Sequence, residues 1–268
     1  MIVLLLCMFL LSPVCLARNS QLDQDFDLET HLLLNQLNAE DEVTTRGEEL
    51  PLPEIACISI GARWSAALAF RRRSISTAYY PFDFIATPLH GLHILLKTKF
   101  RSFLNKGLLK PTRKNNAWLD QNTDSPDQQK PMAKAEQMVV VENSLTGCEF
   151  IHDFKDNKMS NYTTVAQKYQ RRIDRFYRTI AQAKRVYFFR TFLSKQEAAD
   201  LHALLRSLFP TTDFTLVAPT SPERAKQPWR LEGVKEFLMY SPEEKLPAYK
   251  VHGSGAAWDH MFKTLNLI

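Results

Sequence analysis

The chain has 268 residues and a formal net charge of +5, and 45% of its residues are hydrophobic and 11% aromatic. This length suits one domain with extensions or two small domains, and the apolar content is ample for a sizeable core. The basic charge permits contact with nucleic acid, but no nucleic-acid-binding motif accompanies it. A nucleic-acid partner is therefore not expected.

The first 17 residues read as a secretory signal peptide. They form an apolar run without charged side chains, and Cys15 and Ala17 occupy the −3 and −1 positions of a cleavage site before Arg18. The apolar core is about 11 residues long, which is too short to cross a bilayer. An uncleaved anchor and a misassigned start codon are the alternatives, because Lys and Arg are absent from the n-region. We expect secretion or export and no transmembrane segment in the mature chain.

Residues 18–53 form an acidic segment ahead of the globular part. Residues 18–54 hold ten acidic and two basic side chains, which leaves 32 basic and 19 acidic ones in residues 55–268. One short amphipathic helix is expected over residues 28–37. The charge contrast fits a solvated flexible arm or a pro-segment that folds back on the basic body.

The first half of the globular part, which we expect to span residues 54–268, begins with a buried strand and a helix. The residues from 106 to 134 are polar and contain three prolines, so a long loop insertion is expected there. Two apolar runs joined by a Gly-containing turn predict a hairpin. The expected elements are a strand at 54–61, helices at 65–73 and 90–104, and hairpin strands at 137–142 and 148–154.

The second half contains the clearest helix, at residues 163–183. Its apolar residues recur at steps of three and four, and its basic residues at 168–178 fall mostly on the other side. Ser194 and Glu197 form a capping-box pattern at the start of the next helix. The remaining expected elements are strands at 185–189, 214–218 and 234–240, and helices at 194–208 and 256–265. Strands alternating with helices predict an α/β fold with a mixed, partly parallel sheet flanked by helices.

The cysteines that follow the leader are Cys57 and Cys148, and both lie in apolar strand-like segments. They are expected to be two buried thiols, with a disulfide as the alternative in an oxidising compartment. No four ligands occur at the spacing of a structural zinc site, and no nucleotide-binding fingerprint is present. The sequence therefore predicts neither a metal nor a cofactor.

Several short blocks, in order along the chain, resemble one family. The chain is similar to a bacterial domain of unknown function that is described as a putative papain-like cysteine peptidase. The resemblance covers residues 54 to the C-terminus. Its blocks are Ile58-Ser59-Ile60-Gly61, Tyr80-Pro81-Phe82-Asp83-Phe84, Phe150-Ile151-His152-Asp153-Phe154, Asn161-Tyr162, residues 168–176, Phe188-Phe189-Arg190 and Trp258-Asp259.

The resemblance implies a site of the Cys–His–Asp type. The family's cysteine falls at Trp64, its histidine at His152, and its acid at Asp153 or Asp83. In such a site the histidine takes the proton of the thiol and the acid orients the imidazole. An indole has no nucleophilic lone pair, so Trp64 cannot perform the step that a cysteine performs.

Three other residues are candidates for a replacement nucleophile: Ser65, Ser59 and Cys57. Side chains of adjacent residues at a helix start diverge by roughly 100°, which separates Ser65 from the position of residue 64. Cys57 lies inside an apolar strand, which favours an inert thiol. The sequence therefore predicts a non-catalytic member of the family.

The predicted role of this member is to bind a protein or peptide ligand in a cleft. The cleft would be lined by Trp64, His152, Asp153, Asp83 and Arg190, since Arg190 follows a buried strand and strand C-termini line the usual ligand crevice. Two alternatives remain open. One is an active hydrolase or transferase that uses His152 and Asp153 without a thiol, and the other is a secreted interaction protein that uses the basic face of residues 171–178.

Overall fold

Four parallel strands form the first sheet, in the order β1-β6-β7-β8. The computed structural model describes residues 53–62, 65–76, 78–114, 139–221, 227–239 and 255–268, all within the compact unit Glu49–Asp120 with Ser125–Ile268. These strands are rich in buried apolar side chains, as expected of a parallel sheet that is covered on both faces. Their bounds are Ile55–Ser59 (β1), Arg185–Phe189 (β6), Phe214–Thr220 (β7) and Val234–Leu238 (β8).

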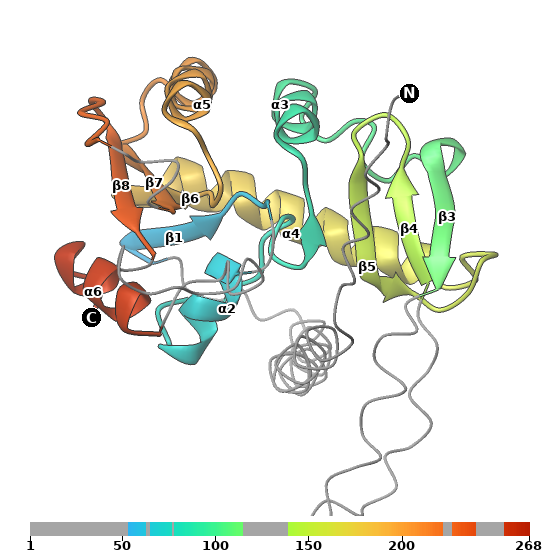
Figure 1. The fold of residues 1–268 in the computed structure, drawn as a ribbon. Helices are drawn as coiled ribbons and strands as arrows, with labels where there is room; N and C mark the ends of the chain where they lie inside the picture. The colour runs from blue at the N-terminus through green and yellow to red at the C-terminus, as the bar shows by residue number, and fades with distance from the viewer. Residues whose placement is uncertain (1–52, 63–64, 77, 115–138, 222–226, 240–254) are drawn as a thin grey trace, which may run out of the picture. The chain divides into compact units, whose positions relative to one another are not determined.

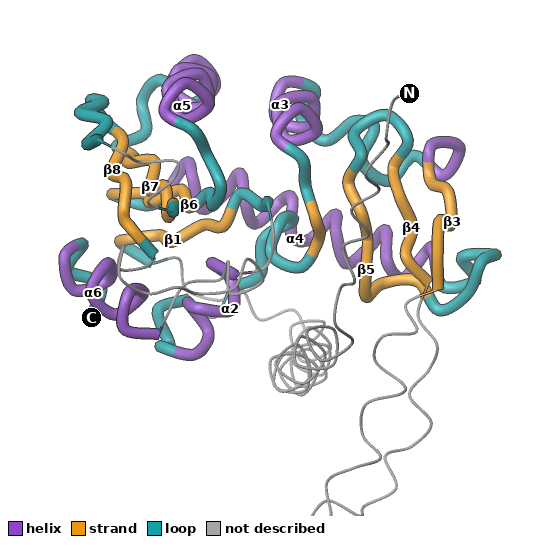
Figure 2. The backbone as a smooth tube through the Cα atoms, in the orientation of Figure 1, coloured by secondary structure: helices purple, strands orange, loops and turns teal. Residues whose placement is uncertain are grey.

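A second sheet is antiparallel and has the order β2-β5-β4-β3 (Figure 2). Its central pair, β4 and β5, is the predicted hairpin. A single bridge between Ala62 and Thr87 connects the segment after β1 with the segment after β2. The strands are Ile85–Ala86 (β2), Leu109–Lys114 (β3), Val139–Asn143 (β4) and Cys148–Phe154 (β5).

Five α-helices in the described part of the chain flank the sheets, and Figure 1 shows α2 and α6 on one face of the parallel sheet and α4 and α5 on the other. The capping box predicted at Ser194 and Glu197 is present at the start of α5. The predicted α/β class, with partly parallel strands flanked by helices, is therefore confirmed, and the strands form one parallel and one antiparallel sheet. The helices are Ser65–Arg72 (α2), Leu89–Lys97 (α3), Tyr162–Gln182 (α4), Lys195–Leu208 (α5) and Gly255–Thr264 (α6).

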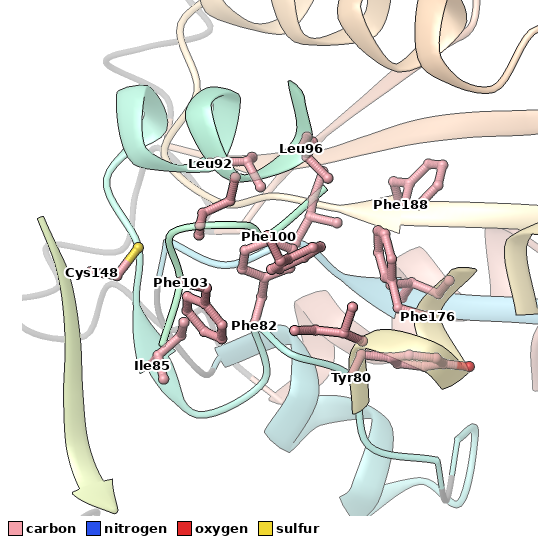
Figure 3. Packing of buried hydrophobic residues seen from close by; sticks show 14 of the residues in the cluster. Tyr80, Phe82, Ile85, Leu92, Leu96, Phe100, Phe103, Cys148, Phe176 and Phe188 are labelled. Carbon is pink, nitrogen blue, oxygen red and sulfur yellow. The ribbon is translucent and has the colours of Figure 1, made fainter. Parts of the chain in front are cut away.

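Aromatic side chains on α4 join the two sheets. Tyr169 packs against Phe150 of β5 with 5.3 Å between ring centroids, and Phe176 packs against Phe188 of β6 at 6.5 Å. Figure 3 shows the same cluster around Phe100. Because Tyr169 and Phe176 are seven residues apart, they lie on the same face of the helix. The regular period of α4 thus fixes how each sheet packs on it.

The expected loop insertion at residues 106–134 is wrong in its first part. Residues 106–108 form the short 3-10 helix η2, and β3 follows directly and pairs with β4 as an edge strand. The register shifts between Pro111 and Arg113. A proline and a register shift suit an edge strand, which needs fewer ladder hydrogen bonds than a central one. Residues 115–134 lie outside the described part, as do the expected helix at 28–37, the leader and the acidic segment.

Candidate functional site

The turn after β1 leads to the position at which the family's cysteine was expected. Gly61 and Ala62 both have a left-handed backbone, with φ of +84° and +71°. Non-glycine residues in this region are strained, and such strain concentrates at functional sites. α2 begins at Ser65, so residue 64 immediately precedes a helix N-terminus. Trp64 itself lies outside the described residues.

Arg190 follows β6, and its side chain bonds the main chain at this turn. Its side chain is buried, and Nη1 donates to the carbonyl oxygen of Ile60 at 2.9 Å while Nη2 donates to that of Thr87 at 2.8 Å. One guanidinium therefore links the end of β1 to the end of β2. Arg190 was predicted to face a cleft at the carboxyl ends of the strands. The structure places it at those ends, with both Nη atoms bonded to the main chain.

Replacing Gly61 with alanine is expected to lower the free energy of unfolding by about 1–3 kcal/mol. A Cβ atom at this position would lie 2.9 Å from Cβ of Thr87 and 3.0 Å from Nη1 of Arg190, and φ would remain positive. Urea unfolding measures the change. Gly107→Ala is the matched control, because the new Cβ would meet only Asn105 Oδ1 at 3.4 Å. Equal stability of both variants would show that the turn relaxes without cost.

Asp83 lies in the aromatic turn before β2 and is 2% exposed. Its Oδ2 accepts a hydrogen bond from the main-chain N–H of Tyr80 at 2.9 Å, and Nη2 of Arg71 is 3.8 Å from the same oxygen. Burial raises the pKa of Asp83 to about 6, although the charge of Arg71, the Tyr80 hydrogen bond and the charges of Arg172 and Arg175 oppose this. Arg71 is in the last turn of α2, whereas residue 64 precedes its first turn.

Asp153, near the end of β5, is bound from α4. Lys168 Nζ forms an ion pair with Oδ1, and the Tyr169 hydroxyl donates to Oδ2 at 2.9 Å. Burial alone would raise the pKa of Asp153, but the charge and hydrogen bond of Lys168, the charge of Arg172 and the hydrogen bond of Tyr169 hold it below its ordinary value. Asp153 is thus a buried, ionised carboxylate that fastens β5 to α4.

His152 is half-buried and lies in an irregular stretch of β5. Phe150 of β5 pairs with Val141 of β4, and Phe154 pairs with Val139, so β5 has more residues than β4 between the two pairs. This irregular stretch of β5 is a bulge that contains His152 and Asp153. A bulge changes the direction of side chains and is frequent next to active sites. The geometry therefore gives His152 an orientation that a regular strand would not.

Arg172 connects the two predicted acids. Its guanidinium carbon lies 5.1 Å from the ring centroid of Tyr79 and 5.3 Å from that of Tyr169. Tyr79 is also covered by Arg71 at 3.9 Å, a distance suited to a cation–π contact. Arg71 and Tyr169 bond Asp83 and Asp153 respectively, so one chain of contacts runs between the carboxylates.

Sequence reasoning did not identify the partners of the two acids, Arg71, Lys168 and Tyr169. The sequence places Lys168 and Tyr169 on the predicted helix and in a matched block, but not beside Asp153. The one available signal is that they lie four and three residues before Arg172, so the three residues share one side of α4. Arg190 belongs to a different group of side chains, around Thr87 and the turn after β1.

The predicted basic face of residues 171–178 is wrong as a solvated surface. Only Arg171 is exposed, while Arg172 is 4% exposed and Arg175 and Arg178 are half-buried. Arg175 donates to the carbonyl oxygen of Tyr79 at 2.8 Å. Arg172 and Arg175 point inward, since Arg172 lies over the rings of Tyr79 and Tyr169 and Arg175 bonds the main chain. The burial of these arginines gives less support to the alternative of a secreted interaction protein that uses this basic face.

All candidate replacement nucleophiles in the described residues are buried. Cys57 and Cys148 are free thiols, as predicted, with exposures of 3% and 0%. Burial raises the pKa of Cys57 to about 12, and it also raises the pKa of Cys148. Ser59 and Ser65 are 0% and 2% exposed. None of the four is placed to attack a substrate from solvent.

The described residues hold neither a candidate metal cluster nor a candidate membrane span. No cluster of three His, Cys, Asp or Glu side chains there is arranged to hold a metal ion. None of the helices in this part of the chain combines the length and the apolar character needed to cross a bilayer.

Comparison with known proteins gives one match. No curated protein and no solved structure matches the chain. The model of one family, described as "Putative papain-like cysteine peptidase (DUF1796)", matches residues 55–217, which include β1 to β6, α2 to α5 and the first part of β7. The match covers more than half of the 268 residues. The chain therefore belongs to this family, a domain of unknown function described as a papain-like cysteine peptidase.

Proposed function

We propose that this protein is a non-catalytic member of its family that binds a protein or peptide ligand in a cleft near the turn after β1. The observation that carries the proposal is the burial of the candidate replacement nucleophiles, and of the second thiol, among the described residues. Cys57, Cys148, Ser59 and Ser65 are each at most 3% exposed. Trp64 stands where the resemblance places the family's cysteine, and an indole is no nucleophile.

The proposed cleft combines an aromatic platform with polar groups. Trp64 would supply the platform, because it precedes a helix N-terminus that follows a strained turn. His152 would line the cleft, since the bulge of β5 sets its direction. Asp153 and Asp83 would position the elements that form the cleft. Their buried carboxylates bind Lys168 of α4 and Arg71 of α2, respectively.

The alternative of a hydrolase or transferase that uses His152 and Asp153 without a thiol has less support. A general base must reach the proton that it removes, and its orienting acid must reach the imidazole. Both carboxylate oxygens of Asp153 are instead engaged by Lys168 and Tyr169 on α4. Asp153 is therefore suited to fastening β5.

Introducing a thiol by Trp64→Cys is expected to create a reactive cysteine. The full chain, wild type and variant, is treated with a cysteine-directed electrophile and a mixed peptide library, and labelled residues are identified by mass spectrometry. The expected result is labelling at residue 64 of the variant, while Cys57 and Cys148 remain unlabelled in the folded wild type. Thiolates react faster than thiols, so a helix N-terminus that lowers the pKa accelerates labelling.

Two further variants calibrate this experiment. Leu145→Cys places a thiol in the hairpin turn, where the native side chain is 48% exposed, and gives the rate of an ordinary surface thiol. Adding His152→Ala to Trp64→Cys tests whether the imidazole activates the new thiol. Peptide turnover by the wild-type protein would overturn the proposal. A residue-64 thiol no faster than the Leu145→Cys thiol would show that the site lacks peptidase geometry.

A further inference from the structure

Arg190 is a buried cation without a carboxylate partner in the described part of the chain. It is 3% exposed, and its two Nη atoms bond main-chain carbonyls. Burial lowers the pKa of Arg190 to about 10, although Cys148 and Glu197 oppose this. The Glu197 carboxylate accepts hydrogen bonds from the N–H and hydroxyl of Ser194 to cap α5. A buried charge is costly unless it is paired. Carbonyl dipoles offset only part of this cost.

The groups around Arg190 are hydrogen-bond donors. Nε of Arg190 and Oγ1 of Thr87 are buried and have no hydrogen-bonding partner of ordinary geometry among the described residues. The neighbour of the Thr87 hydroxyl is the thiol of Cys148, and sulfur is a weak acceptor. Burial, Lys97 and Arg190 lower the pKa of His93, and the charge of Asp200 opposes them. Nε of Arg190 and Oγ1 of Thr87 are thus two buried donors without a strong acceptor among the described residues.

We propose that the junction of Arg190 and Thr87 binds a small monovalent anion. The anion would accept hydrogen bonds from Nε of Arg190 and Oγ1 of Thr87 and would supply the counter-charge that the described residues lack. Its source is either a free inorganic ion or a carboxylate group of a ligand. The site uses Arg190 and Thr87, so its test does not depend on Trp64.

The test is the dependence of thermal stability on the anion present. The full chain is unfolded by heat in potassium chloride, potassium formate and potassium gluconate at equal ionic strength. Chloride represents the inorganic ion, formate the carboxylate, and gluconate an anion too large for a buried site. Above the dissociation constant, Tm is expected to rise by about 3–5 °C for each tenfold increase in the concentration of the anion that binds, relative to gluconate.

Three variants locate the effect. Arg190→Gln removes the charge, and Thr87→Val removes the hydroxyl at nearly constant shape, so both are expected to lose the anion dependence. Arg171→Gln removes an exposed charge and should retain it. If Arg190→Gln fails to fold, Thr87→Val decides. A rise with formate alone identifies a carboxylate, and one with chloride alone an inorganic ion. Equal Tm in all three salts, or an unchanged dependence in Thr87→Val, would overturn the proposal.

Discussion

Replacing Asp153 with alanine is expected to lower the free energy of unfolding by about 3–5 kcal/mol. The change leaves the ammonium of Lys168 and the hydroxyl of Tyr169 without their shared acceptor, in a place where the side chains of Asp153 and Lys168 are 4% and 17% exposed. An uncompensated buried charge is more costly than the absence of the pair. Urea unfolding at neutral pH measures the loss.

The double variant Asp153→Ala with Lys168→Met is the control. It removes the charge and its partner together, so a large part of the lost stability should return. Asp153→Asn keeps the size and one acceptor oxygen, and its loss should lie between those of the wild type and the alanine variant. An absence of recovery in the double variant would show that Asp153 is held by another group, and its assignment as a support of β5 would be abandoned.

Elements with a strong local pattern were predictable. The apolar period of α4 and the capping box of α5 depend on residues within a few positions of each other. The buried strand at residues 185–189 agrees with β6 to the residue. In contrast, β3 is polar and contains Pro111, and it becomes a strand only through pairing with β4. β2 has two residues and exists for the same reason, since it pairs with β5.

The residues of the candidate site could be predicted from the sequence, but the contacts between them could not. Asp83, His152, Asp153 and Arg190 stand out in the sequence as polar groups between apolar runs. Their partners come from elsewhere in the chain, because α4 brings Lys168 to Asp153 and α2 brings Arg71 to Asp83. The inward direction of Arg172 depends on two tyrosine rings, from α4 and from the segment before Tyr80. No regular spacing of residues in the sequence indicates such cation–π contacts.

Raising the pH from 4 to 6 is expected to destabilise the wild type relative to Asp83→Asn by about 2 kcal/mol, the larger part of the full effect of the pKa shift. The pKa of Asp83 is about 6 in the folded protein, against 3.8 for the unperturbed group, chiefly because the carboxyl is buried. Between these values the folded state holds a proton that the unfolded state has released. Stability therefore falls as pH rises through this window, by about 1.4 kcal/mol for each pH unit of the shift.

The difference between wild type and Asp83→Asn isolates this effect, since asparagine has nearly the same shape and does not titrate. Urea unfolding at pH 4, 5, 6 and 7 gives the two curves. The lowered pKa values of His93 and His202 give the opposite slope, but they are common to both proteins and cancel in the difference. Asp153, whose pKa is lowered, contributes stability above its unfolded pKa and loses it only as pH falls further. A difference that stays constant from pH 4 to 6 would mean that Arg71, Arg172 and Arg175 keep Asp83 ionised throughout, and the carboxylate would then be a permanent anchor for these arginines.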